Sequence, residues 1–362
     1  MQLFMKVLTF FLLFLLLNTT VVFSQRAQRD ENLTEQLNPD QALKNVLPFP
    51  LGAAVKVNAL KNNEAYRELI KSQFNSITAE NAMKFGPLHP APDVFKFANA
   101  DFIVDFALKN NIRVHGHALI WPRNLANPKW VLDFKGDKRA WDSLLRVHVT
   151  TIVKHFKGKV ASWDVVNEAF ADNGMLNKNI WLENMGPDYI AKAFQYAHEA
   201  DPKALLFYND YGQEYDGRKI RAILKMVADF KKRGIPIDGL GLQFHTNARV
   251  SKIRITTGIF TAAKSGLLIH LSELEVGVRF QKDKSFKLTP EMAAQQAEKY
   301  KNIFQIYGSI PKKQQFGITT WNVSDGDSFR NSKYKDHDHP LLFDSKYQPK
   351  DAYKVLLEAY SK

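Results

Sequence analysis

Short apolar runs alternate with longer amphipathic stretches along the chain from about residue 51 onward. Most runs are apolar at nearly every position, which is typical of strands covered on both faces of a parallel sheet. The stretches between them repeat apolar residues at helical spacing. We predict strands at 52–58, 74–79, 113–120, 160–166, 204–208, 239–244, 267–271 and 316–321, and helices that include 102–109, 140–156, 189–200, 219–232, 290–307 and 352–360.

Strands that are each followed by a helical segment predict an α/β protein, a (β/α)8 TIM barrel with a single domain. A barrel of about 250 residues with insertions fits the chain of 362 residues. An open doubly wound sheet is the rival fold, but no G-x-G-x-x-G motif follows the first predicted strand. The apolar content of 45% excludes disorder as the overall class.

Residues 1–24 have the pattern of a signal peptide. Lys6 precedes an unbroken apolar run at 10–17, and a small residue, Ser24, fits a cleavage site. The run is shorter than a membrane span requires, although a retained N-terminal anchor is the alternative. We therefore expect an exported protein, whether periplasmic, cell-surface or extracellular. A polar leader at 25–48 would pack on the base of the barrel, and 49–362 would form the catalytic domain.

Composition narrows the chemistry. The chain has no cysteine, which excludes disulfides, thiolate metal sites, a cysteine nucleophile and a lipoprotein anchor. The formal charge is +13, but the lysines are dispersed and no nucleic-acid-binding motif accompanies them. We expect a solvated basic surface, with attraction to an acidic polysaccharide as the alternative. Nucleic acid is not an expected partner, nor is a membrane once the signal peptide is removed.

Polar and aromatic side chains gather at the predicted C-terminal ends of the strands, where a TIM barrel carries its chemistry. A buried ring of such groups would be unstable unless it lined a wet cleft. The ring consists of Glu80, Asn81, Lys84, His115, His117, Trp121, Asn167, Glu168, Asn209, Asp210, Tyr211, Gln243, His245, Glu273, Glu275, Trp321 and Asp325.

Two carboxylates in this ring form a candidate catalytic pair. Glu168 follows the fourth apolar run and Glu273 follows the seventh. Strands four and seven of an eight-stranded barrel lie roughly across from each other, so both carboxylates can face one substrate bond. Two carboxyl groups flanking a glycosidic bond are the minimal apparatus for sugar hydrolysis. The alternative for Glu273 is a structural pair with a lysine or histidine.

A metal hydrolase is the main enzymatic rival. His115 and His117 lie on one face of the third strand, and His245, Asp210 and Glu273 could complete a metal site. A sugar cleft instead needs aromatic platforms that stack on pyranose rings, and Trp121, Tyr211 and Trp321 supply them. We therefore favour a sugar cleft without metal or cofactor.

The strand-end motifs resemble glycoside hydrolase family 10 endo-β-1,4-xylanases. The resemblance covers about residues 45–360 and keeps the family's order of motifs. They are FNSITAENAMKF at 74–85, HGHALIW at 115–121, WDVVNEAF at 163–170, LFYNDYG at 206–212, IDGLGLQFHT at 237–246, LSELEV at 271–276, ITTWNVSDGDSF at 318–329 and PLLFDSKYQPKDAYKVLL at 340–357.

The resemblance implies a retaining double displacement on the β-1,4-xylosidic bonds of xylan by a monomer. Glu168 would be the acid/base and hold a proton at the outset. Glu273 would be the ionised nucleophile, its pKa kept low by His245, with the two carboxyls about 5–5.5 Å apart. The resemblance also implies roles for the residues around this pair. The glycone sugar would be bound by Glu80, Asn81 and Lys84, and the sugar at the cleavage point would be surrounded by His117, Asn167 and Gln243. The sugars would stack on, or the cleft would be shaped by, Trp121, Tyr211 and Trp321, and Glu275 would lie behind His245.

Several positions depart from the family pattern. Phe85 and Phe329 stand where tryptophan is usual, and Phe329 would lie over the glycone sugar. Pro122-Arg123 follows Trp121 where a histidine is usual, Asn322 replaces a glycine, and Glu275 replaces an aspartate. We expect a roomier glycone pocket and, because Arg123 adds positive charge, a preference for decorated, acidic or unusual xylans.

Two other functions stay open at this point. One is a glycosidase of the same barrel design that acts on a different β-1,4-glycan. The other is a non-catalytic carbohydrate-binding protein, which is disfavoured because both carboxylates are present and the tryptophans alone would suffice for binding.

Overall fold

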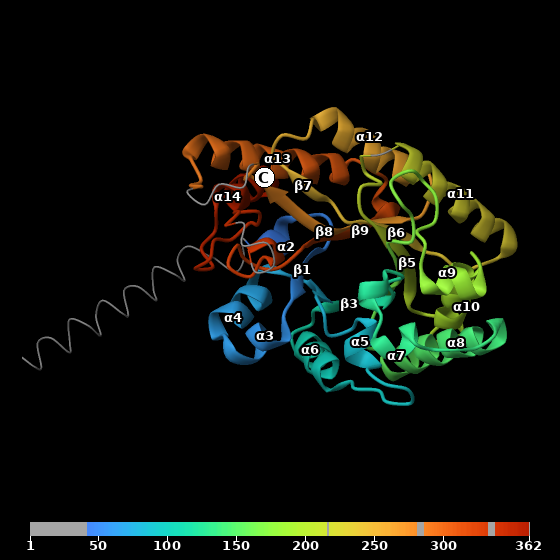
Figure 1. The fold of residues 1–362 in the computed structure, drawn as a ribbon. Coiled ribbons are helices and arrows are strands. Elements are labelled where there is room, and N and C mark those ends of the chain that lie inside the picture. The colour runs from blue at the N-terminus through green and yellow to red at the C-terminus, as the bar shows by residue number, and fades with distance from the viewer. Residues whose placement is uncertain (1–41, 216, 281–285, 332–336, 362) are drawn as a thin grey trace, which may run out of the picture.

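The computed structural model describes residues 42–215, 217–280, 286–331 and 337–361 (Figure 1). The expected signal peptide, and the leader up to residue 41, lie outside the described residues. The rest of the leader forms helix α2 (Leu43–Val46), which packs against the C-terminal helix α14 (Asp351–Tyr360). Leu43 is buried there.

A closed barrel of eight parallel strands forms the centre of the molecule and confirms the predicted fold. The strands follow one another around the barrel in chain order, and β9 pairs with β1 to close it. They are β1 (Leu51–Val55), β2 (Ser76–Ala79), β3 (Arg113–Ile120), β4 (Ser162–Asn167), β5 (Leu205–Asp210), β6 (Gly239–Leu242), β8 (Leu268–Gly277) and β9 (Gln315–Thr320). A short further strand, β7 (His245–Asn247), pairs with the end of β8.

Helices surround the barrel (Figure 1). Those that follow the strands include α4 (Glu64–Gln73), α6 (Ala98–Lys109), α8 (Lys138–His155), α10 (Tyr189–Ala200), α11 (Gly217–Arg233), α12 (Lys252–Ala263) and α13 (Pro290–Gly308). Shorter helices are α3 (Val57–Asn62), α5 (Phe85–Leu88), α7 (Lys129–Leu132) and α9 (Ile180–Met185), with 3-10 turns at Asn124–Ala126 and Lys312–Gln314.

Side-chain caps set where several long helices begin. Asp137 accepts a hydrogen bond from the backbone N–H of Ala140 at the start of α8. Thr289 does the same for Met292 at the start of α13, where Pro290 occupies the first turn without losing a hydrogen bond. The cap at Asp137 explains why α8 begins two residues before the predicted 140, whereas α13 begins at Pro290 as predicted.

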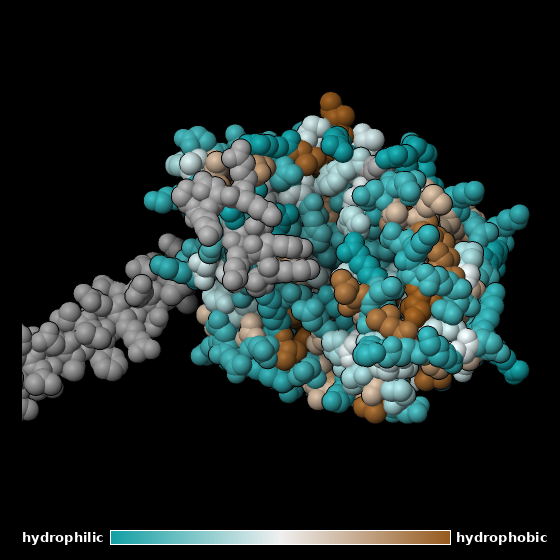
Figure 2. Space-filling model, in the orientation of Figure 1, coloured by the Kyte–Doolittle hydropathy of each residue, from teal (hydrophilic) through white to brown (hydrophobic). Residues whose placement is uncertain are grey.

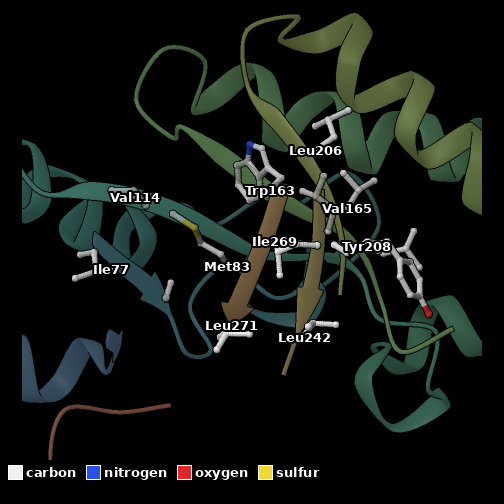
Figure 3. Close-up of a cluster of buried hydrophobic side chains, with 14 of the residues drawn as sticks. Ile77, Met83, Val114, Trp163, Val165, Leu206, Tyr208, Leu242, Ile269 and Leu271 are labelled. Carbon is white, nitrogen blue, oxygen red and sulfur yellow. The ribbon is translucent and has the colours of Figure 1, made fainter. Parts of the chain in front are cut away.

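The hydrophobic core fills the barrel and the layer between strands and helices. Ile77, Val114, Trp163 and Leu206, on the neighbouring strands β2 to β5, and Ile269 on β8 are all buried (Figure 3). Because both faces of each strand are covered, the strands read as continuous apolar runs. Gly116 is required beside Trp163, because a Cβ atom at this glycine would lie 2.1 Å from the indole.

The structure corrects one strand boundary and adds one strand. The predicted seventh strand, 267–271, stops too early, since β8 continues to Gly277. Ser272, Glu273 and Glu275 were placed after the predicted strand, but they are buried within β8. The prediction also missed β7, which at three residues is too short to show a pattern.

The visible surface is mostly hydrophilic, with hydrophobic side chains in small groups (Figure 2). Within the described ranges, none of the helices combines the length and apolarity that crossing a membrane requires.

Candidate active site

A cavity of about 490 Å³ opens at the C-terminal ends of the strands. Its wall contains Arg123 together with every residue that was predicted to act on or bind substrate. These are Glu80, Asn81, Lys84, His117, Trp121, Asn167, Glu168, Tyr211, Gln243, His245, Glu273, Trp321 and Phe329. Glu275 lies behind His245, as expected.

Glu168 directly follows β4, and its carboxylate is held on both oxygens. Gln243 donates to Oε1 over 3.0 Å, and the Trp121 indole N–H donates to Oε2 over 3.1 Å. The guanidinium of Arg123 also approaches Oε2, with Nε at 2.9 Å. The backbone of Glu168 has φ +58°, a conformation that is uncommon outside glycine. Such strain is often found at functional sites, and here it turns the side chain from the strand end into the cavity.

Glu273 lies within β8 and is held by two donors. Asn209 donates to Oε1 over 2.8 Å, and His245 Nε2 lies 3.1 Å from Oε2. Burial acts to raise the pKa of Glu273, but the hydrogen bond from His245 and the positive charges of His117 and His245 outweigh it and lower the pKa below its ordinary value. The arrangement keeps Glu273 ionised.

His245 bridges Glu273 and Glu275 because of the register between β7 and β8. The Cα atom of His245 pairs with that of Glu275, and side chains two residues apart on β8 point to the same side. His245 Nδ1 lies 3.0 Å from Glu275 Oε1, which also accepts from Arg330. Burial acts to lower the pKa of His245, yet the carboxylates of Glu275 and Glu273 raise it to about 10.

A chain of side-chain amides connects the two carboxylates. Gln243 Nε2 donates to Glu168 and, over 3.2 Å, to Asn167 Oδ1. The same Oδ1 accepts from Asn209, which also donates to Glu273. Both carboxylates therefore face one cavity and are oriented by one shared network. Such a network fixes their relative positions before substrate arrives.

The far end of the cavity is built from β2, β9 and the segments after them. Glu80 accepts from Asn322 over 2.9 Å, and Lys56 Nζ lies 3.8 Å away. Lys84 donates to Asn81, and its ammonium lies 5.0 Å from the Trp121 ring centre and 5.9 Å from that of Trp321. The cavity therefore has a polar end between two indole faces.

The histidines and acids of the rival metal site do not converge on one point. His115 and His117 are both bound to Asp164, at 3.1 and 2.8 Å. Asp210 is paired with the buried Lys219 at 2.8 Å. Across the described part of the chain, no three histidine or acidic residues are grouped so that they could hold a metal ion. Asp164 instead fixes Nδ1 of His117, which leaves Nε2 for contact with a substrate.

Comparison with known proteins identifies this kind of site. The family model described as glycosyl hydrolase family 10 matches residues 40–359. The chain belongs to glycosyl hydrolase family 10. Among curated family 10 relatives, a β-1,4-xylanase of Dictyoglomus thermophilum is 39% identical over 314 residues, covering 84% of this chain and 86% of the relative. The endo-1,4-β-xylanase A of Thermoanaerobacterium saccharolyticum is 38% identical over 322 residues.

The second alignment covers 86% of this chain but 27% of the relative, so the chain spans about a quarter of that protein's length. A solved family 10 structure, an intracellular xylanase of Thermoanaerobacterium saccharolyticum as a mutant complex with xylotriose, superposes with a TM-score of 0.79 at 35% identity. The superposition covers 87% of this chain and 96% of that chain.

The contacts of two residues of the site were not predicted from the sequence. Asn209 lies at a strand end with other polar residues, but nothing marked it as the partner of both Asn167 and Glu273. Arg123 stood out as a departure from the family 10 pattern, yet its contact with Glu168 depends on the path of an irregular segment after β3.

Phe85, another departure from the family pattern, lies elsewhere in the structure than expected. Phe85 does not line the cavity. It is buried and stacks on His148, with ring centres 3.5 Å apart. The expectation that Phe85 shapes the glycone pocket of this family 10 protein is therefore wrong, because the side chain packs into an aromatic cluster behind α8. Phe329 does line the cavity, where its ring lies 5.5 Å from that of His245.

Proposed function

We propose that this protein is a retaining endo-1,4-β-xylanase that cleaves the β-1,4-xylosidic bonds of xylan in xylan catabolism. The observation that carries the proposal is the shared cavity of Glu168 and Glu273, in which one amide network orients both carboxylates. The names of the relatives as xylanases support the choice of xylan over other β-1,4-glycans.

The proposal gives each carboxylate its own role. Glu168 gives a proton to the leaving glycosidic oxygen while Glu273 attacks the anomeric carbon, which forms a glycosyl-enzyme and releases the leaving sugar. Glu168 then takes a proton from water as the water attacks that carbon, and Glu273 leaves. His245 keeps Glu273 ionised, and Asn209 holds its other oxygen.

The substrate lies across the mouth of the barrel. Glu80, Asn81 and Lys84 bind the glycone sugar between the indoles of Trp121 and Trp321. Tyr211, beyond Glu168, contacts the leaving-group side. His117, Asn167 and Gln243 surround the sugar at the cleavage point, where a hydrogen bond to its 2-OH strengthens in the transition state.

The test is sugar release by the purified protein from linear xylan and from cellulose, together with the anomeric configuration of the first product. The proposal expects release from xylan with retained configuration. It expects Glu273→Gln to abolish turnover. It expects Glu168→Gln to lose about 10²–10⁴-fold in kcat/KM on xylan but far less in kcat/KM on aryl xylosides, whose leaving groups need no proton in the first step. Preferential release from cellulose would contradict the choice of glycan. Binding of xylan without turnover would favour a non-catalytic protein.

We further propose that the protein is exported and acts as a monomer. The signal-peptide pattern at 1–24 supports export. The N-terminal sequence of the mature protein, isolated from the periplasm or medium of its source cells, tests this, and a retained residue 1 would contradict it. Light scattering tests the monomer.

A further inference from the structure

Arg123 occupies an unusual position for a cation in a site that depends on a proton donor. Its Nε atom lies 2.9 Å from Oε2 of Glu168, and Nη2 donates to the Tyr211 hydroxyl over 3.3 Å. The guanidinium carbon lies 5.9 Å from the Trp121 ring centre and 5.5 Å from that of Tyr211. Arg123 thus reaches from the segment after β3 across the end of β4 to the segment after β5.

This contact conflicts with the role of Glu168. The acid/base has to carry a proton when the leaving oxygen arrives, whereas an adjacent guanidinium stabilises the carboxylate. Arg123 has no need of the pair for its own solvation, because its side chain is 49% exposed. The pair is therefore open to competition by another anion that enters the cleft.

The position of Arg123 indicates where that anion would come from. Glu80, which follows β2, lines the end of the cavity proposed to bind the glycone sugar, and Asn322, which follows β9, donates a hydrogen bond to it. Arg123 follows β3, but its guanidinium donates to Tyr211, which follows β5 on the other side of β4 and Glu168 from β2. A group that meets Arg123 is consequently attached to the sugar on the leaving-group side.

We propose that Arg123 is a specificity-determining residue that binds a carboxylate substituent, of the uronic acid type, on the leaving-group sugar of the xylan. The inference rests on the proposed xylanase function and deepens it. A guanidinium presents several N–H groups in a planar fork that matches a carboxylate. When the substituent takes the guanidinium, Oε2 of Glu168 is released to hold the proton that the reaction needs. The net charge of +13 would favour the approach of such an acidic polymer.

The experiment compares three xylo-oligosaccharides of equal length. One is linear, one carries a single glucuronosyl substituent, and one carries the same substituent with its carboxyl reduced to an alcohol. The reduced form keeps the size of the substituent and removes its charge. The value of kcat/KM for each is measured with the wild type, Arg123→Gln and Arg123→Lys.

Arg146→Gln serves as a matched control. Arg146 lies on α8, forms a 2.8 Å ion pair with Glu199 and stacks over Tyr196, so the substitution removes the same charge from a similar carboxylate and tyrosine. Arg146 is absent from the wall of the cavity. Any effect of net charge on the approach of an acidic substrate would appear in both variants.

The proposal expects the wild type to prefer the glucuronosyl over the carboxyl-reduced substrate by about tenfold or more, as for a hydrogen-bonded charge pair. Arg123→Gln should bring this ratio near one and raise kcat/KM on the linear substrate several-fold, since Glu168 is no longer paired. Arg123→Lys should keep part of the preference. Arg146→Gln should keep all of it.

A wild type without preference, or an Arg123→Gln variant that keeps the preference, overturns the inference while the xylanase function stands. Failure of the wild type to cleave any of the three substrates overturns the proposed function and the inference with it. Equal loss of the preference in Arg146→Gln would assign the effect to net charge and overturn the role of Arg123. Arg123 is exposed, so its variants are expected to fold, and their melting temperatures verify this.

Discussion

The side-chain amide of Asn322 lies 2.9 Å from Oε2 of Glu80. Its carbonyl oxygen accepts a hydrogen bond from the backbone N–H of Phe329 over 3.0 Å. Asn322 is buried and has φ +100°, a conformation that favours glycine, the usual residue of the family here. One strained residue therefore joins Glu80, which is proposed to bind the glycone sugar, to the loop that carries Phe329.

The first prediction concerns Asn322→Gly. Relief of backbone strain gains roughly 1–3 kcal/mol of stability. Loss of partners for Glu80 and the Phe329 N–H costs about the same. We expect little change in melting temperature, but a rise of about tenfold in KM for oligosaccharides that extend into the glycone end, with kcat much less affected.

Asn111→Gly is the control, because Asn111 also has positive φ, at +54°, but is exposed and outside the cavity. It should raise the melting temperature slightly and leave KM as it is. If Asn322→Gly lowered the melting temperature and left KM unchanged, Asn322 would have a structural role alone.

The second prediction follows from the charge state of His245. Its pKa in the folded protein, about 10, lies above the ordinary 6.5 of an unfolded chain. The stability it contributes is therefore complete below about pH 6.5 and is lost as the pH rises through about 10. We expect wild-type stability to fall over this window, and the fall to be shallower in His245→Gln. Denaturant unfolding at a series of pH values measures both slopes.

The same variant tests the role of His245 at Glu273. Glutamine is neutral and cannot replace the imidazolium between two carboxylates, so Glu273 becomes a poorer ionised nucleophile. We expect kcat to fall roughly 100-fold, as for loss of one oriented donor in an active site. The acidic limb of the pH–activity profile should move to higher pH, because the pKa of Glu273 rises when His245 no longer lowers it. An unmoved limb would contradict this role.

Much of the fold was accessible from the sequence because strands covered on both sides are continuous apolar runs. The limits of β3 were predicted as observed, and those of the other barrel strands lie within a few residues, except for the C-terminal end of β8. There, the polar residues Ser272, Glu273 and Glu275 are buried within the strand, and Glu273 lines the cavity. Local polarity could not distinguish a functional strand end from a loop.

The site could be partly predicted from the sequence for a different reason. In a parallel barrel, residues at strand ends meet in one place, so chain order alone gathers Glu168, Glu273 and their neighbours. The contacts that join these residues could not be predicted from the sequence. The contacts of Arg123 with Glu168 and of Asn322 with Glu80 depend on irregular segments, where no periodicity fixes the direction of a side chain.

The third prediction concerns the buried pair of Lys219 and Asp210, which lies next to Tyr211. Lys219→Met leaves a buried carboxylate without its cation, so we expect a loss of about 3–5 kcal/mol in the free energy of unfolding. Burial raises the pKa of Asp210 to about 6 even though Lys219 opposes it. Without Lys219 the carboxyl stays protonated to higher pH, and the loss should be smaller at about pH 5 than at about pH 8.

Denaturant titration of Lys219→Met at these two pH values measures the effect. The double variant Lys219→Met/Asp210→Asn is the control and should recover part of the stability at about pH 8, because it removes the buried charge as well. Equal losses at both pH values, with no recovery in the double variant, would show that the packing of the lysine chain, and not its charge, stabilises this part of the barrel.

The last prediction concerns the size of the glycone pocket. Phe329 lines the cavity beside His245, where an indole would be larger and would add an N–H donor. Phe329→Trp should lower KM for linear xylan about 3–10-fold, through added contact and one hydrogen bond. It should also weaken activity on glucuronoxylan, because substituents on the glycone sugar lose room.

Phe85→Trp is the control. Phe85 is buried against His148, so the indole overpacks the core and lowers stability by about 1–3 kcal/mol without changing the ratio of the activities on linear xylan and glucuronoxylan. An unchanged ratio in Phe329→Trp would contradict the roomier pocket.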